Sequence, residues 1–77
     1  MDQLTRRILD MFNDLQQETL DLHSLFEAGG NDPEAREAVF DCVERLGRDG
    51  LLDEKGNDFY SLSSKGKEAL RHDKLRT

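Results

Sequence analysis

The segment from Arg36 to Leu70 constrains the fold of this chain more than any other part. It begins as an amphipathic helix that ends in Leu-Gly-Arg-Asp-Gly-Leu-Leu at residues 46–52, and it continues through a turn-rich ribbon. It closes with Tyr-Ser-Leu-Ser-Ser-Lys-Gly at residues 60–66. Because the apolar spacing changes from a helical period to a strand period and back, the segment predicts a helix, a hairpin and another helix. This order predicts an α+β fold.

Helical spacing of apolar residues predicts three helices ahead of the hairpin. They run from Asp2 to about Gln17, from Leu20 to Ala28 and from Pro33 to about Arg48. Glycines at 29 and 30 end the second helix because glycine tolerates positive φ, and Asp32 is a favourable N-cap for the third. The apolar stripes that we expect to face the core consist of Leu4, Ile8, Met11, Phe12, Leu15, Leu22, Leu25, Phe26, Ala35, Val39, Cys42, Val43 and Leu46.

The ribbon predicts two short strands and a last, short helix. The first strand begins at residues 51–52, and the second strand covers residues 59–62. Residues 53–58 between them form a turn by composition. Ser63 or Ser64 then caps one or two helical turns, from which Leu70 reaches back to the core. Residues 71–77 are expected to fray.

The length and the first residues of the chain bound its class. A chain of 77 residues buries one modest core, so we expect a single domain over residues 1–77 with its core at about residues 4–70. No segment resembles a signal peptide or approaches the roughly 20 apolar residues that span a bilayer. We therefore expect a cytoplasmic protein without a membrane segment. Cys42, the single cysteine, lies on an apolar helix face, which predicts a buried thiol and no intrachain disulfide.

No residue pattern in the chain predicts catalysis, a metal ion or a cofactor. His23 and His72 are far apart in the sequence, and neither belongs to a spacing that places ligands on one helix face. The carboxylates are spread over exposed helix faces and lack the desolvated pocket that acid-base chemistry needs. We expect a protein that is not an enzyme.

Charge is distributed unevenly along the chain. Residues 1–64 contain 15 acidic and 6 basic residues, a net charge of −9, whereas residues 65–76 contain 5 basic and 2 acidic residues, a net charge of +3. An acidic body repels the phosphate backbone of nucleic acids, whose neutralisation by Lys and Arg supplies most sequence-independent affinity. Any contact with DNA is therefore expected to be local.

Two separated motifs agree in their spacing across the ribbon. They consist of Leu46, Gly50, Leu51 and Leu52 at the helix end and Tyr60, Leu62, Ser63, Lys65 and Gly66 after the ribbon. With the order of helix, short helix, longer helix and hairpin, the chain resembles the winged helix-turn-helix domains of small bacterial and archaeal transcription regulators over about residues 4–70. The resemblance implies a three-helix core, a β-hairpin wing, a short C-terminal helix, DNA binding and commonly a homodimer.

The resemblance also implies which residues contact DNA, because in that family the third helix reads base edges and the wing tip touches the backbone. On the third helix the corresponding positions are Glu34, Arg36, Glu37, Phe40, Asp41, Glu44, Arg45 and Arg48, and on the wing they are Lys55 and Asn57.

Three carboxylates on the third helix, Glu37, Asp41 and Glu44, depart from the family pattern. Readers of DNA usually carry donors at these positions, and one Glu can accept from cytosine, but three acidic residues create a repulsive face. Three hypotheses stay open: a DNA-binding transcription regulator that contacts DNA through Arg6, Arg7 and the basic tail, a protein-interaction module that binds a basic partner, and an inhibitor that mimics DNA.

The basic tail has two interpretations. As a helix it would gather basic side chains that complement the acidic body of a second subunit, giving a homodimer. As a solvated terminus it would do little. Its basic residues are Lys65, Lys67, Arg71 and Lys74.

Overall fold

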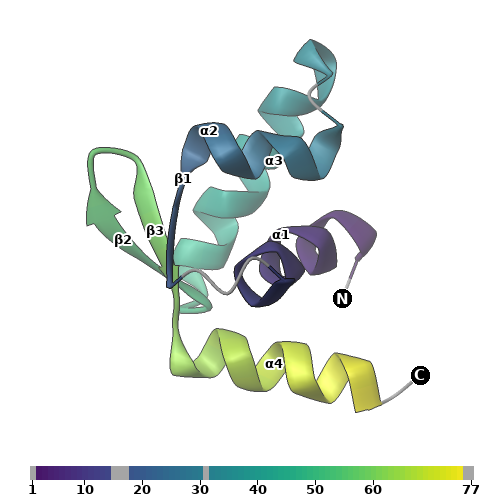
Figure 1. The fold of residues 1–77 in the computed structure, drawn as a ribbon, viewed down its shortest axis with the longest axis vertical. Helices are drawn as coiled ribbons and strands as arrows, with labels where there is room; N and C mark the ends of the chain where they lie inside the picture. Colours follow the sequence, from purple (N-terminus) through teal and green to yellow (C-terminus); the bar gives the residue numbers. More distant parts are fainter. Residues whose placement is uncertain (1, 15–17, 31, 76–77) are drawn as a thin grey trace.

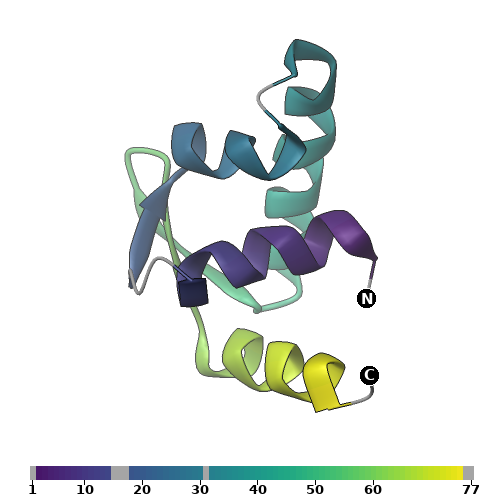
Figure 2. The same cartoon turned by 45° about the vertical axis from the view of Figure 1, so that its right-hand side comes forward.

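The computed structural model describes residues 2–14, 18–30 and 32–75. Within these ranges it contains four α-helices, one 3₁₀ helix and a three-stranded antiparallel sheet, which confirms the predicted α+β class. In chain order the elements are α1 (Gln3–Asp14), β1 (Thr19–Asp21), α2 (Leu22–Leu25), η1 (Phe26–Gly29), α3 (Pro33–Arg48), β2 (Leu52–Gly56), β3 (Phe59–Leu62) and α4 (Ser64–Leu75). Figures 1 and 2 show α1 between the α2–α3 layer and α4, with the sheet along one side.

Helix α3 has the bounds that the sequence predicts. The Asp32 carboxylate accepts a hydrogen bond from the Glu34 amide at 3.0 Å, so the expected N-cap is confirmed. At the other end, Gly50 has a φ of 80°, and the Leu51 amide donates to the Leu46 carbonyl at 2.9 Å. This is the Schellman arrangement, which favours glycine at the left-handed position and turns the chain directly into β2.

The sheet has the strand order β1-β3-β2, with both pairings antiparallel. Between β2 and β3 the turn needs only Asn57 and Asp58, whose φ values are 53° and 64°. Asn and Asp tolerate this region, and positive φ at both positions is typical of the two-residue loops that match strand twist. The prediction of a turn over residues 53–58 is therefore wrong, because an irregularity between Glu54 and Gly56 lets β2 continue through most of that range.

The helix predicted from Leu20 to Ala28 is wrong at its beginning. Leu20 lies in β1 opposite Tyr60, and α2 starts only after Asp21, whose carboxylate accepts from the Ser24 amide at 3.1 Å. Pairing with β3 gives the backbone of residues 19–21 hydrogen-bond partners across the sheet, and this tertiary pairing outweighs the local helical pattern. The predicted end is confirmed, because η1 stops at glycine 29 and Gly30 has a φ of 74°.

Helix α4 is longer than predicted. It extends to Leu75, so the expectation of fraying from residue 71 is wrong within the described residues. Leu70 is only 5% exposed and packs on the core, as predicted. An ion pair of 3.4 Å between Arg6 of α1 and Asp73 supports the second half of the helix, which packs along α1.

The beginning of α4 is fixed on the turn between α3 and β2. The Ser63 hydroxyl accepts from the Gly66 amide at 2.9 Å and donates to the Gly50 carbonyl at 2.6 Å. The Lys65 ammonium donates to the Asp49 carbonyl at 2.9 Å. These contacts give a physical reason for the Ser-x-Lys-Gly motif, because its serine and lysine side chains join the beginning of α4 to the end of α3.

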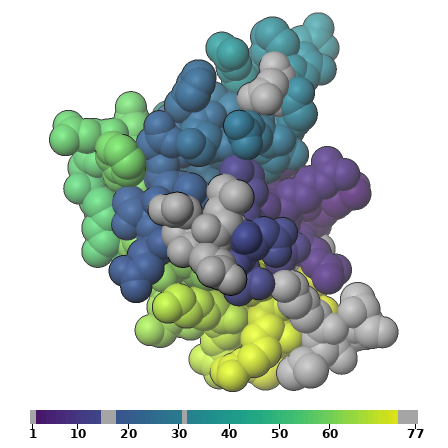
Figure 3. Space-filling view, in the orientation of Figure 1, coloured from purple at the N-terminus to yellow at the C-terminus, as the bar shows by residue number. Residues whose placement is uncertain are grey.

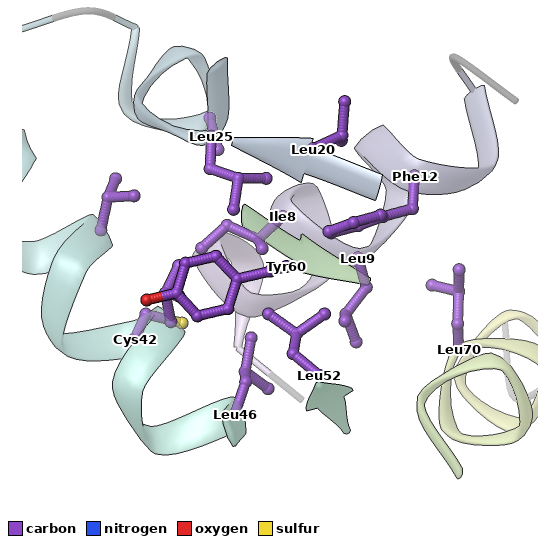
Figure 4. Close-up of a cluster of buried hydrophobic side chains, with 13 residues drawn as sticks. Ile8, Leu9, Phe12, Leu20, Leu25, Cys42, Leu46, Leu52, Tyr60 and Leu70 are labelled. Atoms are coloured by element: carbon purple, nitrogen blue, oxygen red, sulfur yellow. The ribbon is translucent and has the colours of Figure 1, made fainter. Parts of the chain in front are cut away.

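The hydrophobic core draws on every helix and strand (Figure 4). Its members within the described residues are Ile8, Leu9, Phe12, Leu20, Leu25, Ala28, Val39, Cys42, Val43, Leu46, Leu52, Tyr60 and Leu70. Leu4, Met11, Leu22 and Phe26 are partly buried and pack against this cluster, and Cys42 is buried as predicted. Ala35 is partly exposed and is not a member of the cluster, so the expectation that it belongs to the core is wrong. Leu15 and the predicted helix end near Gln17 lie outside the described residues.

Candidate functional site

The exposed side of α3 carries the positions that the sequence analysis selected. All eight of them are exposed: Glu34, Arg36, Glu37, Phe40, Asp41, Glu44, Arg45 and Arg48. Glu37, Asp41 and Glu44 recur at spacings of four and three residues and form one surface, which we call the acidic face. Within the described part of the chain, no cation forms an ion pair with these three carboxylates. Their charge is therefore available to a ligand.

Two of the predicted positions, Arg36 and Arg45, contact residues outside the acidic face. The Arg36 guanidinium lies over the Phe26 ring, 5.7 Å from its centroid. Arg45 forms an ion pair of 3.6 Å with Asp2 at the beginning of α1. Glu34 belongs to the first turn of α3, where its amide donates to the N-cap and its side chain stays exposed. The structure thus divides the predicted set into a continuous acidic face and residues that support the fold.

A groove lies between α3 and the β2–β3 hairpin and has a volume of about 610 Å³. Its lining consists of Phe40, Val43, Glu44, Gly47 and Arg48 from α3 and Glu54, Asp58 and Tyr60 from the hairpin. The volume falls within the roughly 300–1,000 Å³ of ordinary ligand clefts. We call Glu44, Glu54 and Asp58 the groove carboxylates; with Arg48 they leave the lining with a net charge of −2. Through Glu44 the groove is continuous with the acidic face.

Tyr60 joins the groove to the core. Its side chain is 7% exposed, and in Figure 4 its phenol oxygen points from β3 toward α3. None of the described residues forms a hydrogen bond with the hydroxyl, whose oxygen is open to solvent in the groove. Burial raises the pKa of the Tyr60 phenol above its ordinary value, and the negative charges of the groove carboxylates raise the pKa further. The phenol therefore stays protonated at neutral pH at the bottom of a negatively charged groove.

The sequence analysis did not select most of this groove. The sequence pattern predicts only that Tyr60 lies in the second strand of the hairpin and that Glu54 and Asp58 lie in its turn. The signal that would have found them is the pairing of a buried aromatic residue with acidic residues two and six positions earlier in the same hairpin. Which of these residues meets α3 depends on the twist of the hairpin, which the sequence pattern does not give.

The predicted basic contacts gather elsewhere. Lys55 and Lys67 line a second hollow of about 500 Å³, bounded by α1, β1, the β2–β3 hairpin and α4, and Glu18 shares it. Asn57 lies at the exposed hairpin turn, which projects from the body together with the rest of the hairpin in Figure 3. Arg71 is exposed on α4, Lys65 is held by the Asp49 carbonyl, and the side chain of Lys74 lies outside what the structure describes.

Two further properties of the described residues concern clusters of metal-ligating side chains and helices that could span a membrane. Over residues 2–14, 18–30 and 32–75, no group of three or more His, Cys, Asp and Glu side chains is placed to hold a metal ion. None of the helices in these ranges is both long and apolar enough to cross a membrane.

Comparison of the chain with protein-family models, with curated proteins and with solved structures found no match.

Proposed function

We propose that the protein is a winged-helix protein-interaction module that binds a basic segment of another protein through the acidic face and the adjoining groove. The order of helix, short helix, longer helix and hairpin supports the winged-helix assignment. In this interpretation α3 occupies the position of the recognition helix and the β2–β3 hairpin is the wing. The proposal assigns no catalytic role to the chain.

One observation carries the proposal: the acidic face is exposed, unpaired within the described residues and continuous with the negatively charged groove. Its charges repel phosphate and attract cations. Phe40, which is 39% exposed, adds an apolar contact of the kind that interfaces favour at their centres. A segment of Lys or Arg with apolar side-chain stems matches both properties.

The test is binding of a fluorescent basic decapeptide, measured by anisotropy at low and high salt. The test variant carries Glu37→Lys, Asp41→Lys and Glu44→Lys. The control variant carries the same charge change at Asp14, Glu18 and Glu27, which are exposed outside the acidic face. We expect the test variant to weaken binding at least tenfold more than the control variant, because like charges then face each other directly. Equal weakening by both variants would show that only net charge matters and would refute the assignment of the site.

DNA binding is the second candidate function, and one observation favours it. Lys55 of the hairpin and Lys67 of α4 line the same hollow, so two predicted backbone contacts converge although they are distant in sequence. Lysine side chains at such a position neutralise phosphates. In this alternative, Lys55→Glu with Lys67→Glu abolishes retention of random duplex DNA in a mobility-shift assay, whereas the Lys variant of the acidic face strengthens retention.

A further inference from the structure

We infer that the groove receives an arginine side chain of the partner, whose guanidinium lies among the groove carboxylates and donates a hydrogen bond to the Tyr60 phenol oxygen. This inference rests on the proposed function and narrows its ligand to one side-chain chemistry. The aliphatic stem of the arginine would lie against Phe40, which lines the groove beside the carboxylates and is 39% exposed.

The first argument is the phenol oxygen of Tyr60, which opens into the groove. The Tyr60 ring is fixed in the core, yet its oxygen has no hydrogen-bond partner among the described residues and faces the groove. The ring is buried but the oxygen is accessible to solvent in the groove, so water bonds to it until a ligand takes its place. A donor that enters the groove would satisfy this oxygen. Packing alone would be served equally well by phenylalanine, so the hydroxyl is the part of this side chain that the fold does not use.

The second argument is the charge on both walls of the groove. Glu44 projects from α3, and Glu54 and Asp58 project from the hairpin, so a cation between the walls meets negative charge on two sides. Arg48 is the opposing charge on the lining, and it leaves two carboxylates in excess. Burial raises the pKa of the Tyr60 phenol, and the negative charges of the groove carboxylates raise it further, in keeping with the charge on the two walls. An anion is disfavoured there and a cation is favoured.

The third argument concerns the kind of cation. A guanidinium is planar, presents five donors in a fixed fork and is more weakly hydrated than an ammonium group. It can therefore bond to a carboxylate and to the phenol oxygen at the same time, and hydrogen bonds of this charged type are short and strong. Its plane also suits the exposed ring of Phe40. An ammonium group has three donors on a single atom, so it cannot reach the carboxylate and the phenol oxygen with a planar fork, and it binds less tightly in this groove.

The experiment uses two decapeptides, one of alternating arginine and glycine and one of alternating lysine and glycine. Binding is followed by amide chemical shifts of the isotopically labelled protein, which detect weak complexes of a chain this small. The variants are Tyr60→Phe, which removes only the hydroxyl, and Glu54→Gln, which removes one groove charge. Asp53→Asn is the matched control, because Asp53 is an exposed carboxylate next to Glu54 that does not line the groove.

We expect the arginine peptide to bind more tightly than the lysine peptide. Tyr60→Phe weakens arginine binding about tenfold, as the loss of one charged hydrogen bond implies, and changes lysine binding less than about twofold. Glu54→Gln weakens both peptides, Asp53→Asn weakens neither, and Tyr60→Phe leaves the unfolding midpoint of the protein unchanged.

The outcomes separate this inference from the proposed function. Equal binding of the two peptides, with no effect of Tyr60→Phe, refutes the inference that the groove binds an arginine side chain. The proposed binding of a basic partner would still stand. An arginine preference that survives Tyr60→Phe also overturns it, because the preference then arises outside the groove. Failure of both peptides to bind at low salt refutes the proposed function and the inference together.

Discussion

Replacing Gly66 with alanine tests how closely the beginning of α4 approaches the turn after α3. A Cβ atom built at Gly66 overlaps the Leu51 carbonyl oxygen and lies 2.7 Å from Cδ1 of Leu62. Neither neighbour can yield freely, since one is backbone and the other packs against the core. The added methyl group therefore forces α4 to move away from β2 and from the α3 terminus.

The magnitude follows from the contacts that this movement disrupts. The hydrogen bonds from the Ser63 hydroxyl to the Gly50 carbonyl, at 2.6 Å, and from the Ser63 amide to the Leu51 carbonyl, at 3.1 Å, both join α4 to that turn. Their loss costs about 1 kcal/mol each, and partial exposure of the buried side chain at position 70 costs about 1–2 kcal/mol. Alanine has a higher helix propensity than glycine, which offsets about 1 kcal/mol of this loss. The net expectation is a loss of about 2–3 kcal/mol in the free energy of unfolding.

Urea denaturation followed by far-ultraviolet circular dichroism measures this loss. With a slope of about 1 kcal/mol per molar urea for a small domain, the midpoint of Gly66→Ala falls by about 2–3 M. Gly47→Ala is the control, because Gly47 is also helical and its added Cβ meets nothing within 4 Å. The control is expected to gain about 0.5–1 kcal/mol. A Gly66→Ala midpoint equal to or above that of the wild type would refute the close approach of α4 to the Leu51 carbonyl.

Three further predictions concern the caps and α4. Ser63→Ala removes the cap of α4 and is expected to cost about 1–2 kcal/mol in urea titrations, whereas Ser64→Ala changes an exposed hydroxyl and costs less than about 0.5 kcal/mol. Hydrogen bonds from Ser24 hold the pKa of Asp21 below its ordinary value, so this cap stabilises the fold at neutral pH and loses that contribution as the pH falls through the folded-state pKa. Thermal melts from neutral pH to about pH 3 are therefore expected to show a smaller acid-induced loss for Asp21→Asn, and an equal loss would contradict the capping role. Leu70→Ala is expected to destabilise by about 2–4 kcal/mol in urea titrations, and a change below about 1 kcal/mol would mean that α4 is not docked.

The features of α3 could be predicted because their signals are local. Asp32 before proline marks its beginning, Gly50 supplies the left-handed residue at its end, and the helical period assigns its inner and outer faces. The exposure of Glu37, Asp41 and Glu44 follows from the same period. The part of the candidate site that lies on one helix was therefore accessible from the sequence.

The rest depends on contacts between distant segments. Leu20 sits in a helical pattern, yet its backbone pairs with β3, about 40 residues later in the chain. The second half of α4 lacks a strong apolar stripe, and the ion pair between Asp73 and Arg6 joins it to α1. The groove requires the hairpin to fold toward α3 and bring Tyr60 to its floor. None of these pairings leaves a periodic signal in the sequence.

The central claim is that the face formed by α3 and the groove binds a basic protein segment rather than DNA. The most direct measurement is a pair of amide chemical-shift titrations in the same low-salt buffer, one with the alternating arginine-glycine decapeptide and one with random duplex DNA. We predict that the peptide shifts amides of α3 and the β2–β3 hairpin and that the duplex shifts none of them. Shifts of α3 amides by the duplex at micromolar concentration, weakening as salt is added, would contradict the claim and establish a DNA-binding surface.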